Sequence, residues 1–403
     1  MNTSRKISKL LAVVWGIALF TVIFAVPYKA TVNSRSGRDY ASYHYAVKAA
    51  YNNDSPYTVE VLNQLAIEEG TRKSVHPFFY PPPAILSVLW LQPFTLKQGV
   101  LVFFWFNQFC LLGTLVILHR WRNVPWSVLF AASLFLWPVI DTMKMGQINL
   151  FVGLMVLVAL RYRSGVGLAV ASMTKMSPAL LFFGWIVGKE WRAAGVCVFG
   201  CVSLSVAVMP WVSIQEQLIF YTEILPEFSS GAYHGLKIPI NIPANHSIPD
   251  VYNQIFPGES KTVLSGSAKQ LSSMTSGLIF ATILFWIRSL TDTEAKLFGL
   301  MSLIPLMLIT PVYCYEHHMA LLLVPIVLCL QTIKTKNVSA CVLAWGLLLF
   351  GGQPLFSLRW LQRNIGVGEW WFQESKFFFI VSIGLYCVWY ARKVETQSLT
   401  QSS

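Results

Sequence analysis

Long apolar segments recur along the whole chain and alternate with short polar ones. Clear examples cover residues 10–27, 100–118, 193–209 and 278–287. Segments of this kind approach the roughly 20 residues with which a helix crosses the hydrocarbon core of a bilayer. The pattern predicts an all-α polytopic membrane protein. We expect a single integral membrane domain over residues 1–403, with about 12 transmembrane or re-entrant helices and residues 10–27 as a retained first span.

Three apolar segments are shorter than a standard span. Residues 82–94 form one of them, and residues 166–173 and 179–187 form a pair separated by residues 174–178. Broken helices at membrane depth are tolerated only where they line a cavity or are covered by protein. We therefore predict re-entrant or strongly tilted helices here, at the walls of a site.

Basic clusters mark the predicted cytoplasmic loops, and they occur at residues 5–9, 120–122, 161–163, 189–192, 334–336 and 392–393. The positive-inside rule then places both termini in the cytoplasm. The segments between these clusters face outward. They are a first outer loop at residues 28–80, a long outer loop at residues 211–274, and turns at 143–149, 310–318 and 351–376.

The first outer loop contains two candidate amphipathic helices. Apolar and aromatic residues recur at helical spacing from Tyr40 to Tyr51. A second stripe starts after Ser55 and Pro56, which suit an N-cap and a first helical position, and it stops at Gly70. Both helices are predicted to lie on the membrane surface, where tyrosine is favoured.

Composition supports lipid as the main solvent. The chain is 55% hydrophobic and only 12% charged, with a mean hydropathy of +0.55. A net charge of +12 arises from basic residues in short clusters, so we predict lipid headgroups and phosphates as partners, and no nucleic acid. The seven cysteines lie in or beside apolar segments and are predicted to be free thiols.

Two charged residues stand out as candidates for chemistry. Asp39 follows Arg38 at the start of the first predicted amphipathic helix. It could act as a general base beside Arg38 and His44, or it could satisfy backbone donors at the helix start. Lys175 lies between two half-length apolar segments, where an ammonium needs a partner: a substrate phosphate, or a headgroup reached by snorkelling.

Histidines and amides supply further candidates. Glu316, His317 and His318 are adjacent, and successive helical positions point about 100° apart, so one histidine at most faces a given cavity. This predicts a catalytic or phosphate-contacting histidine, or an interfacial anchor, and no metal site. The proline-rich loop with Asn245 and His246 suits sugar hydroxyls but needs no ligand to exist. Gln147 and Asn149 open an apolar helix, as a simple outer turn or as donors facing a lumen.

Several signatures are missing from the sequence. It contains no phosphate-binding glycine loop, no CxxC pair and no Asp-x-Asp arrangement. We therefore expect no cofactor, no metal and no cytosolic nucleotide-dependent mechanism.

Taken in order, the motifs resemble glycosyltransferase family 87, membrane enzymes with a GT-C-type fold. The matching elements are Gly37–Tyr40, Ser55–Tyr57, Tyr80–Pro82, Gly146–Asn149, Lys175–Pro178, Asn245–Ser247, and Thr310–Pro311 leading to His317 and His318. The resemblance implies an inverting transfer of a sugar from a polyprenyl-phosphate donor to a lipid or glycan acceptor. Mannose is carried over from the mannosyltransferases of this family, and arabinose, glucose or another hexose stays open. The resemblance places this reaction at the outer face of the bacterial cytoplasmic membrane.

The resemblance also implies roles for residues. Asp39 would be the base, and Lys175, His317, His318 and Arg38 would contact the donor phosphate. The substrates would be bound by Tyr40, His44, Tyr80, Gln147, Asn149, Asn245, His246 and Glu316.

Three other functions remain open at this point. A membrane transporter or flippase for a lipid-linked or anionic substrate also uses broken helices and intramembrane charge, although its usual inverted repeats are not seen in this sequence. A glycan ligase with a lipid-diphosphate donor would favour more basic residues in the long outer loop. A purely structural membrane protein would make the charged candidates incidental.

Overall fold

The computed structural model describes Tyr28 and residues 37–135, 137–231, 239–242, 244–332 and 374–402, and every regular element in these ranges is a helix. The all-α prediction therefore holds for this part of the chain. The predicted first span, the basic cluster at 334–336 and most of the predicted outer turn at 351–376 lie outside the described residues.

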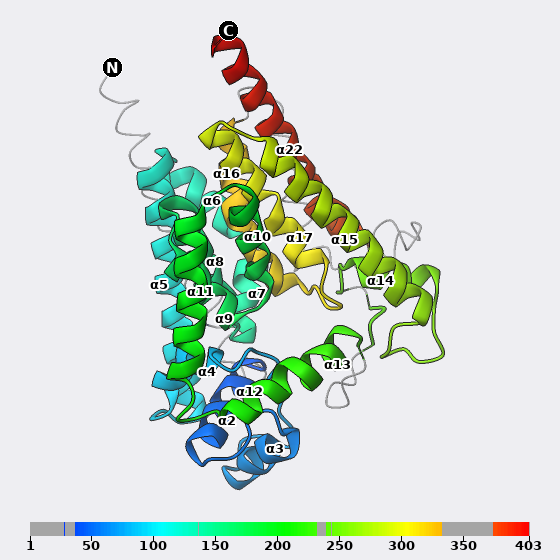
Figure 1. Cartoon of the computed structure of the whole chain (residues 1–403). Coiled ribbons are helices and arrows are strands. Elements are labelled where there is room, and N and C mark those ends of the chain that lie inside the picture. Colours follow the sequence, from blue (N-terminus) through cyan, green and yellow to red (C-terminus); the bar gives the residue numbers. More distant parts are fainter. Residues whose placement is uncertain are drawn as a thin grey trace, which may run out of the picture.

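Four short elements form one end of the molecule, namely α2 (Tyr40–Tyr51), α3 (Val59–Glu68), α4 (Ala84–Val88) and η1 (Leu89–Leu91) (Figure 1). The helix predicted from Tyr40 to Tyr51 is confirmed, but the expectation that its aromatic face is exposed to the membrane surface is wrong. Tyr40, Tyr43 and Tyr45 are at most 1% exposed, because α2 packs against protein on nearly all sides. A core helix of this kind presents no aromatic face to the interface.

The start of α3 differs from the prediction. The N-cap is Thr58, three residues beyond Ser55, because the Ser55 carbonyl and hydroxyl accept hydrogen bonds within a preceding turn. The predicted end is confirmed. Gly70 follows the helix with a φ of 64°, a left-handed conformation that glycine adopts without strain.

The helices that follow in the sequence run from α5 to α11, and α5 is the longest of them. They are α5 (Leu96–Arg122), α6 (Trp126–Phe135), α7 (Trp137–Met145), α8 (Asn149–Tyr162), α9 (Gly165–Thr174), η2 (Ser177–Ala179), α10 (Leu180–Val187) and α11 (Trp191–Ala207). A capping box between Thr95 and Gln98 starts α5. The predicted break between two half-length helices is confirmed: α9 ends at Thr174, because Pro178 cannot supply the backbone N–H that would continue it.

The second half adds α12 (Ile214–Ile219), η3 (Phe220–Ile224), α13 (Leu225–Ser229), α14 (Ile248–Ile255), α15 (Gly266–Ser289), α16 (Thr293–Met301), α17 (Leu303–Ile309), η4 (Glu316–Leu322), α18 (Leu323–Thr332) and α22 (Ser375–Ser402). Much of the predicted long outer loop is therefore helical, and α15 begins inside it. These helices pack on one another and on the first half of the chain: η4 packs on α7 and α8, α14 packs on α15, and α22 packs on α16 and α17.

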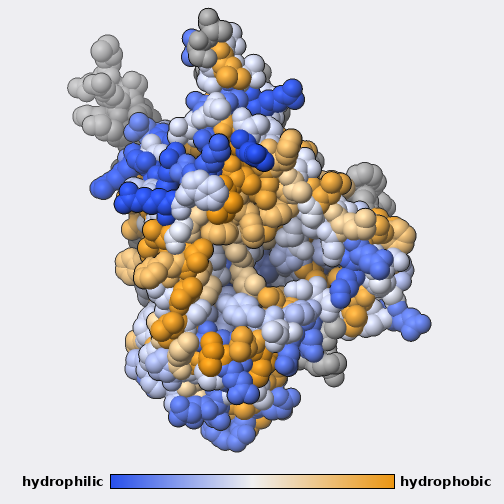
Figure 2. All heavy atoms as spheres, in the orientation of Figure 1, coloured by the Kyte–Doolittle hydropathy of each residue, from blue (hydrophilic) through white to orange (hydrophobic). Residues whose placement is uncertain are grey.

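Three described helices are long and apolar enough to cross a membrane: α5, α15 and α22. The other apolar helices are shorter, so the predicted number of about 12 is not confirmed. Large apolar side chains such as Phe109, Phe199, Leu278, Phe285 and Leu385 are more than half exposed on α5, α11, α15 and α22. Figure 2 shows apolar surface between two hydrophilic ends, which suits a protein surrounded by lipid.

Candidate active site

The turn between α7 and α8 holds the first turn of α2. The backbone N–H of Asp39 donates to the Met145 carbonyl at 3.0 Å. Gly146 in this turn has a φ of 70°, and a Cβ added there would lie 2.6 Å from Cβ of Tyr40. Only glycine satisfies both conditions, so this close approach fixes where Asp39 lies.

The Asp39 side chain does not cap its helix. Asp39 occupies the N-cap position of α2, yet its carboxylate makes no capping hydrogen bond to the backbone. Instead, Oδ2 accepts a hydrogen bond from Gln147 Nε2 at 2.8 Å. Of the two predicted roles, the structure therefore does not show the capping one. The carboxylate is partly exposed, which leaves it accessible for proton transfer.

Gln147 is oriented by two tyrosines. The hydroxyls of Tyr43 and Tyr80 lie 2.7 Å apart, and each is 3.0 Å from Gln147 Oε1. Burial, together with the charge of Asp39, raises the pKa of Tyr80 above its usual range, so its phenol stays a neutral donor. Because Oε1 accepts from the phenols, the amide N–H₂ faces Asp39.

A second chain of hydrogen bonds links Lys175 to the turn before α18. Lys175 Nζ donates to Asn149 Oδ1 at 2.7 Å, and Asn149 Nδ2 donates to the His317 carbonyl at 2.8 Å. The Thr142 hydroxyl donates to the same carbonyl at 2.8 Å. The helix break, the start of α8 and η4 therefore meet at one place. An ammonium has three donors, and Asn149 uses one of them.

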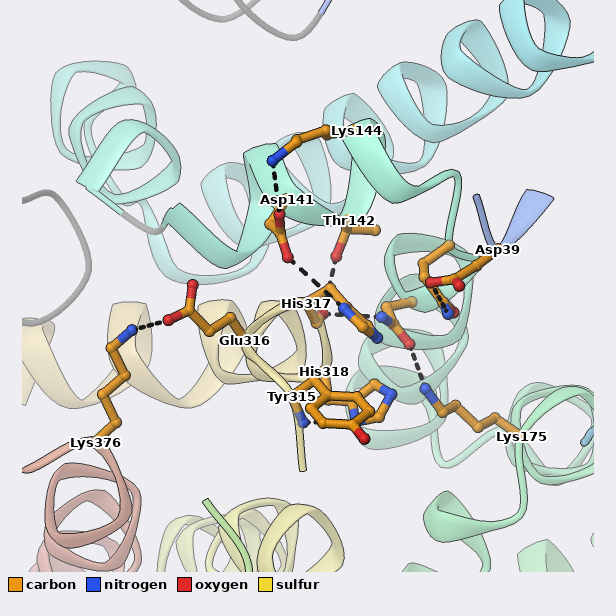
Figure 3. A network of polar contacts seen from close by, with 12 residues as sticks. Asp39, Asp141, Thr142, Lys144, Lys175, Tyr315, Glu316, His317, His318 and Lys376 are labelled. Atoms are coloured by element: carbon orange, nitrogen blue, oxygen red, sulfur yellow. Dashed lines mark hydrogen bonds and ion pairs between the residues drawn. The ribbon is translucent and has the colours of Figure 1, made fainter. Parts of the chain in front are cut away.

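The two histidines diverge, as their spacing predicts (Figure 3). Their ring planes are 83° apart, with centroids separated by 4.4 Å. Nδ1 of His317 lies 3.7 Å from Asp141 Oδ2, whereas the His318 ring lies on the Lys175 side (Figure 3). Nδ1 of His318 accepts the backbone N–H of Tyr315 at 3.2 Å, so its neutral ring carries the proton on Nε2.

Positive groups surround the start of α2. Arg38 is exposed beside Asp39, and Arg72 Nη2 donates to the Gly37 carbonyl at 3.4 Å. Burial lowers the pKa of His76, and the charges of Arg38 and Arg72 act in the same direction while Asp39 opposes them. These four side chains therefore share one electrostatic environment.

Two residues predicted to contact substrate are buried side chains of α2. The Tyr40 ring packs on Phe103 with centroids 5.4 Å apart, and its hydroxyl faces Gly99. His44 is 1% exposed, with Nε2 3.8 Å from Glu69 Oε2. Burial lowers the pKa of His44 to about 4, so the ring is uncharged at neutral pH. The substrate contacts of Tyr40 and His44 stay predictions.

The residues predicted from the proline-rich loop and from Glu316 form a separate group. Asn245 Oδ1 accepts the backbone N–H of Cys314 at 2.7 Å, which ties the loop to the turn before η4. His246 is fully buried, and its backbone N–H donates to the Cys314 carbonyl at 3.0 Å. Glu316 forms an ion pair with Lys376 and points away from Lys175 (Figure 3). Substrate contacts by these three residues also stay predictions.

Sequence reasoning missed four polar residues of this region: Tyr43, Arg72, His76 and Asp141. Asp141 could have been found, because a lone acid inside an apolar segment is itself a sign of function. Tyr43 was identified only as part of an apolar stripe. Within the described ranges, no three His, Cys, Asp or Glu side chains are arranged to hold a metal ion.

A carboxylate near an ammonium and imidazoles suits the transfer of a group from a phosphate to a hydroxyl. The sequence profile described as Glycosyltransferase family 87 matches residues 78–311, more than half of the chain. No curated protein and no solved structure matches the chain itself. The matched segment includes Tyr80, Gln147 and Lys175, whereas Asp39 precedes it and His318 follows it. The protein is therefore a membrane glycosyltransferase, and the chain belongs to glycosyltransferase family 87.

Proposed function

We propose that the protein is an inverting glycosyltransferase of the GT-C type with a polyprenyl-phosphate sugar as donor. Mannose is the proposed sugar, and the hydroxyl of a lipid or glycan is the acceptor. The reaction takes place at the outer face of the bacterial cytoplasmic membrane. It needs no cofactor, because the base and the phosphate ligands belong to the chain itself.

Asp39 is the proposed general base. An acceptor hydroxyl is a weak nucleophile until its proton is removed. The Asp39 carboxylate takes this proton as the acceptor oxygen bonds to the anomeric carbon of the donor sugar. Gln147, at 2.8 Å from Oδ2, is a positioning residue that holds the carboxylate. Attack from the face opposite the phosphate inverts the anomeric configuration.

Lys175 and His318 are the proposed ligands of the leaving phosphate. When the bond between the anomeric carbon and the phosphate oxygen breaks, polyprenyl phosphate leaves with both bonding electrons and gains negative charge. The Lys175 ammonium and the Nε2–H of His318 are donors suited to this charge. Asn149 bonds to Lys175 and to the His317 carbonyl, and Thr142 bonds to the same carbonyl. These hydrogen bonds hold Lys175 close to η4, which carries His318.

The outward placement rests on the positions of basic residues. The guanidinium of Arg161 lies 5.4 Å from the ring centroid of Trp121, next to Arg122, so the basic ends of α5 and α8 lie together. These ends are far from α2 and the Asp39 region (Figure 1). By the positive-inside rule, the basic end faces the cytoplasm and Asp39 faces outward.

The observation that carries the proposal is the convergence of Asp39 with Gln147 and of Lys175 with Asn149 on the two ends of one short turn, residues 147–149. The test is to incubate purified protein with polyprenyl-phosphate mannose and membrane lipid extract. Asp39→Asn should lower transfer by about 10²- to 10⁴-fold. Asp54→Asn, an exposed change in the same outer loop, is the matched control and should transfer like wild type. Equal transfer by wild type and Asp39→Asn would remove Asp39 as the base.

A further inference from the structure

A second group of buried polar side chains lies beside η4, separate from the residues that surround Asp39 and Lys175. We call it the α14 cluster, and it consists of His246, Asp250, Gln254, Tyr315 and Glu374. Gln254 Nε2 joins its two acids, donating to Asp250 Oδ2 at 2.9 Å and to Glu374 Oε1 at 2.8 Å. Three segments distant in sequence therefore meet here: α14, the turn before η4, and the start of α22.

Four members of the α14 cluster have buried polar atoms without a hydrogen-bond partner among the described residues. These atoms are both ring nitrogens of His246, Asp250 Oδ1, the Tyr315 hydroxyl and Glu374 Oε2. His246 and Asp250 are fully buried, and Glu374 is 1% exposed. Proteins rarely leave buried polar atoms unpaired, since each costs about 1–3 kcal/mol. Five such atoms in one place indicate a ligand that supplies several hydrogen-bonding groups.

The charge state of the α14 cluster selects the kind of ligand. Burial raises the pKa of Asp250 to about 9, helped by Glu374, and burial also raises the pKa of Glu374. Burial lowers the pKa of His246 well below its usual range, as does the nearby charge of Lys376, which itself pairs with Glu316. Near neutral pH the cluster thus presents a carboxylic acid and a neutral imidazole, both of which donate and accept. Such groups match neutral hydroxyls better than they match a phosphate or a metal cation.

Tyr315 connects the α14 cluster to the proposed reaction centre. Its backbone N–H donates to His318 Nδ1, and its ring lies 5.9 Å from the His318 ring. Burial raises the pKa of its phenol, and the carboxyl groups of both Asp39 and Asp250 lie near enough to act in the same direction. A molecule that places one hydroxyl at Asp39 can therefore extend past Tyr315 toward α14.

We propose that the α14 cluster is a recognition subsite for the hydroxyl-rich headgroup of the acceptor, a sugar or polyol whose reacting hydroxyl lies at Asp39. The assignment rests on the proposed function for its acceptor role. His246 and Asp250 bind neighbouring hydroxyls, and Tyr315 contacts the ring between the subsite and the base.

Direct binding tests the subsite without requiring turnover. The full-length protein, in an amine-oxide detergent without sugar, is titrated with octyl α-mannoside, and with octyl phosphocholine as a probe of equal chain length that lacks hydroxyls. Tyr315→Phe removes only an unpartnered hydroxyl and should fold like wild type. It should weaken octyl mannoside binding roughly 3- to 10-fold and leave octyl phosphocholine unchanged. His246→Phe, which keeps an aromatic ring, should also weaken the sugar probe alone.

The matched control is Tyr252→Phe in α14, because the Tyr252 hydroxyl bonds to Thr275 and not to the cluster. It should bind both probes like wild type. Wild-type affinity for octyl mannoside in both cluster variants overturns the subsite, and so does equal affinity of wild type for the two probes.

Transfer assays distinguish a failure of the proposed subsite from a failure of the proposed function. If wild type transfers sugar from polyprenyl phosphate and Tyr315→Phe leaves the acceptor KM unchanged, the subsite is wrong and the function stands. If the binding pattern holds but wild type transfers nothing from any polyprenyl phosphate, the acceptor role and the proposed donor fail together. A rise in acceptor KM with donor KM unchanged supports both.

Discussion

Replacing Gln147 with methionine tests whether the amide positions Asp39. Methionine has a similar length and no strong hydrogen-bonding group. The change removes the 2.8 Å hydrogen bond to Asp39 and the acceptor shared by Tyr43 and Tyr80. The two phenols still bond to each other at 2.7 Å, so only one hydroxyl hydrogen loses its acceptor.

The size of the effect follows from these contacts. A hydrogen bond to a charged group contributes about 1.5–3 kcal/mol, and an unpaired buried donor costs about 1–3 kcal/mol. Because Gln147 is 5% exposed, water does not readily replace it. Together these two contributions predict a loss of stability of about 2.5–6 kcal/mol. Freed from Gln147, the carboxylate samples other positions, and a misplacement of about 1 Å costs about 100-fold in rate.

The assay is steady-state transfer from polyprenyl-phosphate mannose, with kcat and both KM values measured beside the melting temperature. The account predicts a fall in kcat of about 10- to 100-fold with the donor KM unchanged. Gln64→Met, at an exposed glutamine of α3, is the control and should leave kcat unchanged. A folded Gln147→Met protein whose kcat stays within twofold of wild type would refute the positioning role.

Three further predictions concern the turn, the α14 cluster and the phosphate ligand. Gly146→Ala should destabilise the protein by at least about 1–2 kcal/mol, because a Cβ at φ 70° is strained and meets Tyr40; an unchanged melting temperature would contradict this. The pKa of Asp250, about 9 in the folded protein, exceeds its unfolded value, so its contribution to stability is full below about pH 4 and is lost as the pH rises toward 9. The melting temperature of wild type should therefore fall from pH 5 to pH 9 more steeply than that of Asp250→Asn, and parallel slopes would exclude this carboxyl. Lys175→Met should weaken binding of sugar-free polyprenyl phosphate by about 10-fold or more in a titration, and unchanged affinity would place the phosphate elsewhere.

Local signals predicted much of the frame of the site. Pro178 marks a helix break because it lacks a backbone N–H, and the structure places Lys175 at that break. The aromatic spacing that starts at Tyr40 predicts α2. The same spacing cannot tell whether protein or lipid covers a helix, because both are apolar. The burial of α2 therefore depends on neighbours, such as Phe103, that are distant in sequence.

Long-range pairings were beyond the sequence pattern. Gln147 and Asp39 are 108 residues apart, and Gln254 and Glu374 are 120 residues apart. Asp39 and Gln147 are candidates in the sequence, but no local pattern links them, and no local pattern links Gln254 to Glu374. The spacing of His317 and His318 predicts that their rings diverge, but only the packing of η4 on α7 and α8 shows that His317 lies beside Asp141.

The most direct test of the central claim uses purified wild-type protein and two labelled donors. Mannose is supplied on polyprenyl phosphate or on a nucleoside diphosphate, with the same membrane extract as acceptor. The account predicts labelled product from the polyprenyl donor alone, with the anomeric configuration opposite to that of the donor. Product from the nucleotide sugar alone, or product that retains the donor configuration, would contradict it.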